Sequence, residues 1–471
     1  MARDFGLKII FGIAILWIDS SFVYSQADSV TLSYKAYIEN IFQYHPIAKT
    51  ADLRIKEAEA EMLDARGNLD PVISSDWNQK NFDDKLYYRQ YQTKFKIPTL
   101  LGIDAVGGYE NTDGIFLNPE NSTDEFGLWH LGIEVNLLQG LYINERRTAM
   151  DQARVFQELA KNEQQIILND LVYNASVAYI LWQQYAFAEE VLTENVTIAN
   201  TYFENTKQAF ANGEKTAMDT LEAFILYQDA RAVKQKNELG LIKARRNIEN
   251  FLWFDEIPIT LRENTLPENY LSPIFQDFEM FEDSDLSEHP IILSSLNKLS
   301  YLDIEQKLKR EKLKPKLKIK YNPLLATSSN NISPSYSVSD FKWGFDFSMP
   351  LLFRSERASL QKGAIKIQET KFNLETKRNE LQNKIENSWQ QQGLLEDQLT
   401  ILSDNVESYK QLLDGENEKF NYGESSVFLL NKRQEKYING QLKVLETYIK
   451  RQIELLNFLY FSNQLIDQFA E

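Results

Sequence analysis

The chain has 471 residues, of which 51 are basic and 68 acidic, so its formal charge is −17. Its lack of cysteine excludes disulfides, thiolate zinc sites and cysteine nucleophiles, and its three histidines leave few general bases or metal ligands. The acid excess argues against binding to nucleic-acid backbones, which needs clustered Lys and Arg, so composition disfavours most enzymes and most nucleic-acid binders.

The N-terminus has the parts of a secretory signal: Arg3 and Lys8 precede an apolar run over 9–18, and small residues follow up to Ser25. The run is shorter than the ~20 apolar residues that a membrane-spanning helix needs. A buried first helix is the alternative. We expect residues 1–25 to be a signal peptide, which would place the mature protein outside the cytoplasm.

Six stretches in which apolar and polar residues alternate predict strands. On the last stretch the apolar positions are Phe341, Trp343, Phe345 and Phe347. One apolar and one polar face suit the wall of a membrane barrel, although a soluble sheet over a core gives the same alternation. Because the protein is expected to be exported and this face is aromatic, we expect these four residues to face lipid. The stretches lie near 73–77, 91–97, 103–109, 129–137, 316–321 and 341–347.

The positions of the twelve prolines predict long helices. No proline stands between Pro119 and Pro258 or after Pro350, and proline breaks helix interiors. A helix over about 60 residues of the first window would be ~90 Å long. Within both windows apolar residues recur at alternating steps of three and four, as on the seams of packed helices. These stripes cover 167–203, 395–413 and 438–456.

The chain is an internal duplication. A His-Pro pair at 45–46 recurs at 289–290, and a Phe-x-x-Gly-Glu segment at 210–214 recurs at 420–424. Each copy is predicted to hold a short helix, strands and a long helical hairpin. The segment between them is acidic and contains proline. We expect a first repeat over 26–254, a connector over 255–288 and a second repeat over 289–471.

The signal peptide, the two copies, the strands, the helical hairpins and the Phe-x-x-Gly turns together resemble the TolC family of outer-membrane efflux proteins. The resemblance implies a mixed α/β membrane protein whose long antiparallel α-helical hairpins form an α-barrel tunnel. Its strands would join a trimeric transmembrane β-barrel, with four strands from each chain of the homotrimer. The six predicted strands exceed that number, so the surplus pair is expected either as an extracellular hairpin or as part of a larger barrel.

The resemblance also implies a location and partners. The protein would lie in the outer membrane of a Gram-negative bacterium, in contact with its lipid, and extend into the periplasm. There it would meet a periplasmic adaptor (membrane fusion) protein and an inner-membrane efflux transporter.

The Phe-x-x-Gly turns are where the resemblance implies adaptor docking, at the periplasmic tip of each hairpin. Glycine also ends helices by taking the left-handed conformation, and both roles can hold at once. The tip residues so identified are Phe210, Gly213, Glu214, Phe420, Gly423 and Glu424.

Asp219, six residues after Gly213, stands where the resemblance implies an acid that closes the periplasmic gate. A solvated acid in the first turns of a helix is the alternative, because the helix dipole favours it. The second copy departs from the pattern: it has Leu429 and Lys432 where acids would be expected.

We therefore expect a passive channel-tunnel of a tripartite efflux or type I secretion system, with no catalysis, cofactor, metal or nucleic acid. The alternative is a soluble periplasmic coiled-coil adaptor or scaffold, which also uses long hairpins. An exported hydrolase is disfavoured. His45 and His289 precede proline in both copies, which indicates a repeated structural role, and His130 stands on a predicted strand.

Overall fold

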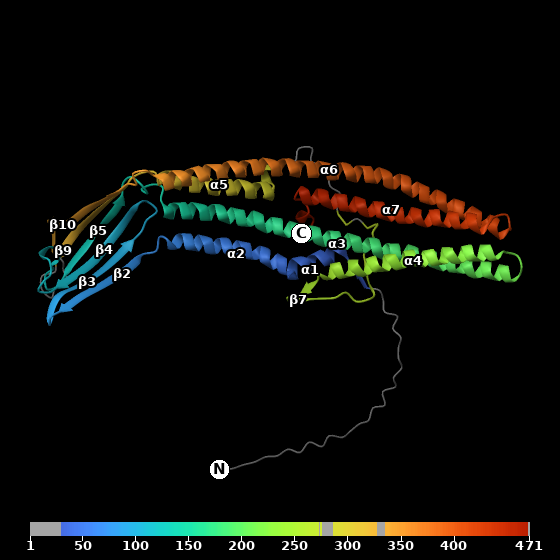
Figure 1. Cartoon of the computed structure of the whole chain (residues 1–471), viewed down its shortest axis with the longest axis horizontal. Helices are drawn as coiled ribbons and strands as arrows, with labels where there is room; N and C mark the ends of the chain where they lie inside the picture. The colour runs from blue at the N-terminus through green and yellow to red at the C-terminus, as the bar shows by residue number, and fades with distance from the viewer. Residues whose placement is uncertain (1–29, 273, 276–285, 327–334, 470–471) are drawn as a thin grey trace, which may run out of the picture.

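The computed structural model describes residues 30–272, 274–275, 286–326 and 335–469. The predicted signal peptide, 1–25, lies outside these residues. The described chain is elongated. A sheet lies at one end of a set of long helices, and the turns that join the helices into two hairpins lie at the other end (Figure 1). Within the described ranges, no helix has both the length and the apolar character needed to cross a membrane.

Two long helical hairpins set the length of the molecule. Helix α3 (Glu145–Ala211) has 67 residues and packs antiparallel to α4 (Ala217–Glu249). Helix α6 (Arg354–Asn421) has 68 residues and packs in the same way on α7 (Val427–Phe461). At 1.5 Å per residue, each long helix spans ~100 Å. The long helices predicted from the two proline-free windows are confirmed.

The shorter helices are α1 (Tyr34–Tyr44), α2 (Pro46–Gly67) and α5 (Pro290–Glu311). The repeated His-Pro pair begins α2 and α5. His45 Nδ1 accepts a hydrogen bond from the Ile47 amide at 3.1 Å, and His289 Nδ1 accepts one from Ile291 at 3.2 Å. Proline follows at the first helical position, where its missing N–H costs nothing. Both histidines are buried, so their repeated role is structural, as the sequence predicted.

Small side chains at seven-residue intervals hold the helices together. Helix α4 buries Ala223, Ala230, Asn237 and Ala244. A strict seven-residue repeat keeps one seam of a left-handed supercoil facing its partner, and small residues let the backbones approach closely. Of the three predicted apolar stripes, 167–203 and 438–456 contain deeply buried positions. The stripe over 395–413 is only partly buried in the single chain.

An aromatic core ties the start of the chain to the middle of α3. The Tyr34 hydroxyl and Ser176 Oγ lie 2.6 Å apart, and the Tyr179 hydroxyl donates to the Leu32 carbonyl at 2.7 Å. Beside this core, β1 (Val30–Leu32) pairs in parallel with β8 (Thr265–Pro267). The described part of the acidic connector, which also contains β7 (Ile257–Pro258) paired with β6 (Trp253–Phe254), therefore packs on the first repeat.

All six predicted strand stretches form strands, and they lie in one antiparallel sheet in the order β10-β9-β5-β4-β3-β2. The surplus pair of the first repeat is therefore hydrogen-bonded within the sheet of this chain. Three single-turn 3₁₀ helices complete the described structure: Pro119–Asn121, Leu286–Glu288 and Ile466–Phe469. The strands are β2 (Val72–Phe82), β3 (Lys85–Ile97), β4 (Ile103–Asp113), β5 (Leu128–Asn136), β9 (Lys316–Ala326) and β10 (Ser335–Ser348).

The buried cap of α5 predicts a loss of stability in mild acid. Burial lowers the pKa of His289 from 6.5 to about 4, so the folded protein needs the neutral ring. The unfolded chain takes up the proton first, so the stabilisation is complete above pH 6.5 and declines as the pH falls towards 4. We expect wild-type protein to lose about 2 kcal/mol from this group between pH 8 and pH 5.

His289→Asn should remove this part of the pH dependence in thermal unfolding measured in detergent. At pH 8 the variant should stay within about 1 kcal/mol of wild type, because asparagine is a good N-cap. An unchanged loss of stability at pH 5 in the variant would contradict the assignment.

Candidate functional site

One face of the sheet is apolar and exposed along every strand. On β10 the side chains of Phe341, Trp343, Phe345 and Phe347 are 45%, 62%, 62% and 59% exposed. These residues were expected on one face of a strand, and the structure places them so. Neighbouring strands continue the same face, with Leu131 of β5 64% exposed. Exposed apolar side chains that continue over several neighbouring strands mark a surface for contact with a membrane or another protein.

A ladder of aromatic rings crosses this face from β2 to β5. Trp77 lies 5.9 Å from Tyr91 between ring centroids, Tyr91 lies 6.3 Å from Tyr109, and Tyr109 lies 4.9 Å from Trp129. Of the aromatic strand residues, only those of the last strand were expected to face lipid. The same period-two alternation in the first repeat would have found the ladder, once the strand register was known.

The opposite face is polar and holds buried ion pairs. Glu134 of β5 is 5% exposed and binds Lys94 of β3 at 2.7 Å, Lys96 at 3.4 Å and Lys318 of β9 at 3.2 Å. Buried charges are tolerated only when they are paired in this way. The Glu134 carboxylate thus binds amines of β3, which lies on one side of β5 in the sheet, and of β9, which lies on the other side.

A second buried carboxylate lies next to it. Asp104 of β4 is 4% exposed and binds Lys96 at 2.8 Å and Arg146 of α3 at 2.6 Å. A second contact, from Arg146 Nη2 at 3.4 Å, makes the arginine pair bidentate. This pair fixes the first turn of α3 against the sheet. We call Lys94, Lys96, Asp104, Glu134, Arg146 and Lys318 the polar-face cluster.

The polar face is the concave one. Lys342 of β10 reaches Glu110 of β4 at 3.6 Å, although two strands, β9 and β5, lie between them. Long side chains can meet over that separation only if the sheet curves towards them. The apolar face is consequently convex.

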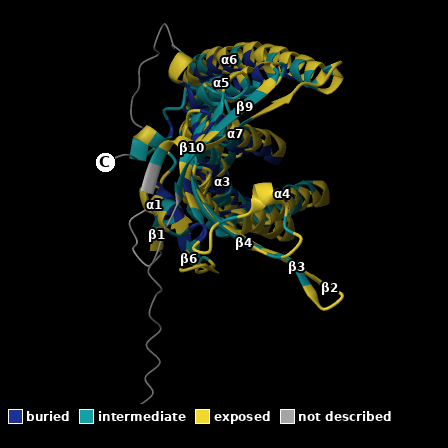
Figure 2. Cartoon of the chain, turned by 90° about the vertical axis from the view of Figure 1, so that its left-hand side faces the viewer, coloured by how far each residue is buried: buried dark blue, intermediate teal, exposed yellow. Residues whose placement is uncertain are grey.

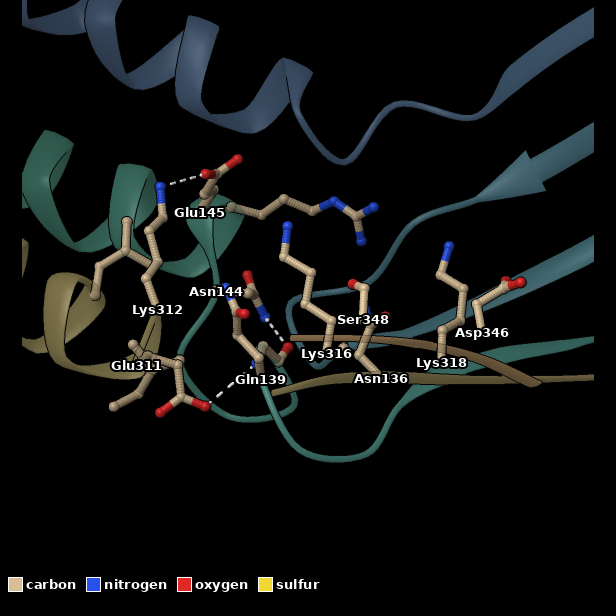
Figure 3. A pocket seen from close by; sticks show the side chains of 15 residues that line it. Asn136, Gln139, Asn144, Glu145, Glu311, Lys312, Lys316, Lys318, Asp346 and Ser348 are labelled. Atoms are coloured by element: carbon tan, nitrogen blue, oxygen red, sulfur yellow. Dashed lines mark hydrogen bonds and ion pairs between the residues drawn. The ribbon is translucent and has the colours of Figure 1, made fainter. Parts of the chain in front are cut away.

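A cavity of about 490 Å³ lies where the sheet joins the helices. Its lining is polar and charged, with Lys312, the residue after α5, bound to Glu145 of α3 at 2.8 Å and the Gly140 amide donating to Glu311 at 3.2 Å (Figure 3). Lys316 also lines it and makes no ion pair among the described residues. The junction is therefore hydrophilic on the side that carries the polar face.

At the far end, both hairpin tips end in the same turn. Gly213 and Gly423 have φ of +79° and +77°. The amide of Glu214 donates to the Ala209 carbonyl at 2.8 Å, and that of Glu424 donates to Lys419 at 2.9 Å. These are Schellman turns, in which glycine takes the left-handed conformation that ends a helix. The Glu214 and Glu424 side chains are exposed and form no ion pair in the described part of the chain.

Asp219 takes part in the N-terminal cap of α4. Its carboxylate accepts hydrogen bonds from the Thr216 amide at 2.8 Å and hydroxyl at 2.7 Å, and its own amide donates to Thr216 Oγ1 at 3.2 Å. This is a capping box. The bonds from Thr216 lower the pKa of Asp219, so it is charged at neutral pH. The structure thus gives Asp219 the helix-start role, and its role in a gate stays a prediction.

The second tip is held differently. Ser426 caps α7 alone, because Leu429 stands where Asp219 stands in the first copy. In place of a capping box, the Glu416 carboxylate of α6 accepts hydrogen bonds from Ser425 Oγ at 2.6 Å and from Arg433 Nε at 3.3 Å. The Ser425 bond lowers the pKa of Glu416. The sequence did not predict this pair, because the two residues lie outside the turn motif, 17 residues apart, and meet only across the hairpin.

The two tips also touch each other. The ring of Phe420 lies 5.5 Å from that of Tyr202 on α3, and Lys215 Nζ lies 5.0 Å above it. Phe210, its counterpart in the first copy, is 46% exposed. The paired phenylalanines of the motif therefore differ: one joins the two hairpins, and the other faces solvent.

No family model matches the chain, and no curated protein matches its sequence. Solved structures do match its fold. The open state of the MtrE outer membrane channel of Neisseria gonorrhoeae is 13% identical, has a TM-score of 0.67, and covers 92% of this chain and 89% of its own. The VceC outer membrane protein of Vibrio cholerae is 12% identical and has a TM-score of 0.66. The match covers 90% of this chain and 95% of VceC.

CusC, whose structures concern transmembrane channel formation, is 14% identical with a TM-score of 0.67 and covers 91% of both chains. The chain has the fold of the TolC-like outer-membrane channels. The match extends over the helices and the sheet together, since the aligned share exceeds nine-tenths of the chain in these structures at low sequence identity. Within the described residues, no group of three or more His, Asp or Glu side chains is arranged to hold a metal ion.

The tip turns predict a local loss of stability on losing glycine. A β-carbon at Gly213 would meet no atom within 4 Å, so the cost of Gly213→Ala comes from the left-handed backbone alone, about 1 kcal/mol. Hydrogen exchange in the last turn of α3 should accelerate roughly fivefold.

Gly393→Ala is the matched control. Gly393 lies inside α6, also with no atom within 4 Å, and there alanine should stabilise the helix by about 1 kcal/mol. Equal effects of the two substitutions would contradict the turn assignment.

Proposed function

We propose that the protein is the outer-membrane channel of an export system, a passive duct that carries solutes across the outer membrane and the periplasm without catalysis. The observation that carries this proposal is the sheet, which has a convex apolar face and a concave charged face on the same six strands. A soluble protein would bury the apolar face and expose the charges. A barrel in lipid needs the reverse, because the bilayer surrounds it and water fills it.

The strand lengths support a membrane barrel. The strands have 9 to 14 residues, and about 9–11 residues cross a bilayer at the usual tilt. Open strand edges are not tolerated in lipid, so the sheet must close with other copies of the chain. A homotrimer, as the resemblance implies, meets this need. The helices, ~100 Å long, would then extend the duct through the periplasm.

The exposed apolar side chains at the hairpin tips support the binding of a partner at the end of the molecule away from the sheet. Apolar side chains are exposed there on both hairpins: Met218 is 73% exposed, Leu221 54%, Tyr422 82% and Phe428 58%. These residues and the tip turns fit a periplasmic adaptor, and through it an inner-membrane transporter, in a tripartite efflux or type I secretion system. A soluble coiled-coil adaptor is disfavoured, because it has no use for an exposed apolar sheet.

Conductance tests the duct. Reconstituted protein should form pores in planar bilayers, and Glu134→Gln should shift the reversal potential in a KCl gradient towards anion selectivity. The substitution leaves the three amines around residue 134 without their carboxylate on the face assigned to the lumen. It should also weaken the sheet by about 3 kcal/mol, because it breaks buried ion pairs.

Glu145→Gln is the control, since the Glu145 side chain is 77% exposed and its one ion pair among the described residues is with Lys312. It should leave both selectivity and stability close to wild type. Absence of pores, together with release of the protein by osmotic shock, would favour the adaptor instead.

The gate proposal for Asp219 can be separated from its capping role. Glutamine and glutamate both complete a capping box, but only glutamate keeps the charge. If Asp219 contributes to a charged gate, Asp219→Gln should raise single-channel conductance or relieve block by divalent cations at least twofold, whereas Asp219→Glu should behave as wild type. Equal behaviour of the two variants would leave Asp219 as a helix cap only.

A further inference from the structure

The sheet ends in two long, unpaired edges. Strand β2 pairs only with β3, and β10 pairs only with β9, so the outer side of each has no strand partner among the described residues. These edges are 11 and 14 residues long. Every residue of β2 is exposed, as Figure 2 shows at the margin of the sheet. Exposed edges of this length are templates for pairing with another strand.

We infer that β10 of one copy pairs with β2 of the next, so that three copies close a barrel of eighteen strands, and not the twelve that the resemblance implies. This inference rests on the proposed trimeric duct. The other strands of the described chain have two or three residues and pair elsewhere. A second copy is therefore the occupant that can match edges of this length.

Strand direction fits this closure. With an even number of antiparallel strands, the two edge strands run in opposite directions. Strand β2 follows α2 and leaves the helices, whereas β10 returns to them and leads into α6. Placed side by side, β10 and the next copy's β2 would be antiparallel with their helix-proximal ends at one level.

The stagger of the sheet fits a closed barrel. One row of paired residues runs from Ile97 through Ala105, Ile133 and Tyr321 to Trp343. Ile97 is the last residue of β3, but Trp343 lies five residues before the end of β10 at Ser348. Four steps between strands thus shift the row by five residues. At 3.3 Å per residue and about 4.8 Å between strands, this tilts the strands by roughly 40°, within the range of closed barrels.

The side chains select one register between copies. With apolar residues kept on the convex face, the stagger of five residues over four strand steps falls between two registers. One of them places Trp77 opposite Trp343 and Ile73 opposite Phe347. All four side chains are at least 59% exposed in the single chain, and the contacts would cover them. Aromatic cross-strand pairs of this kind stabilise sheets.

The other register, two residues further along the stagger, is disfavoured by charge. It would bring Lys80 opposite Lys342 and Asp76 opposite Asp346, and like charges in direct opposition destabilise a sheet. In the favoured register Lys342 faces Asn78 instead.

Engineered disulfides test the closure, and the chain has no cysteine of its own to interfere. Asn78→Cys with Lys342→Cys should cross-link most of the oxidised outer-membrane protein into covalent dimers and trimers on denaturing gels, because opposed strand residues lie within disulfide reach. Reductant should restore the monomer. Lys80→Cys with Lys342→Cys covers the register two residues away.

Glu110→Cys with Lys342→Cys tests the competing closure, in which β2 and β3 leave the sheet and β4 becomes the edge of a twelve-stranded barrel. Cross-linking through β4, or none through either β2 pair in a trimeric preparation, would overturn the inference and leave the proposed duct standing. A monomer found in the periplasmic fraction would instead refute the duct itself.

Discussion

The close packing of long helices on seams of small residues is the constraint on which the rest of this structure depends. The buried positions 223, 230, 237 and 244 of α4 recur at intervals of seven, and the alanines at three of them let neighbouring helices approach along their length. Because the seam is regular, a helix of 67 residues can run without a break. That length separates the sheet from the tips, so two unrelated surface chemistries stand at opposite ends of one chain.

The sheet end is governed by alternation and charge. Apolar side chains occupy the convex face, and on the concave face the buried carboxylates of Glu134 and Asp104 are held in ion pairs. Arg146 links this cluster to the first turn of α3, so the helices and the sheet are joined through a charge pair as well as through the chain. In the proposed barrel the same cluster would set the field in the lumen near its junction with the tunnel.

The tip end shows how the two copies have diverged around one fixed element. The glycine turn is the same in both, with nearly equal φ at Gly213 and Gly423. The helix start after it is not: a capping box at Asp219 is replaced by a serine cap, with Glu416 and Arg433 bound across the hairpin. The backbone requirement at the turn admits glycine best, whereas several side-chain arrangements can begin a helix.

The sequence by itself determined the duplication, the long helices, all six strands and the tip turns, because each depends on local spacing: proline-free windows, period-two alternation and glycine after a helix. It also predicted which residues share the aromatic face of β10. Only the tertiary structure decided that the surplus strands join one sheet, that the polar face is concave, and that Asp219 caps its helix while Glu416 meets Arg433. These features depend on which distant segments lie side by side, and residue spacing along one chain does not specify that.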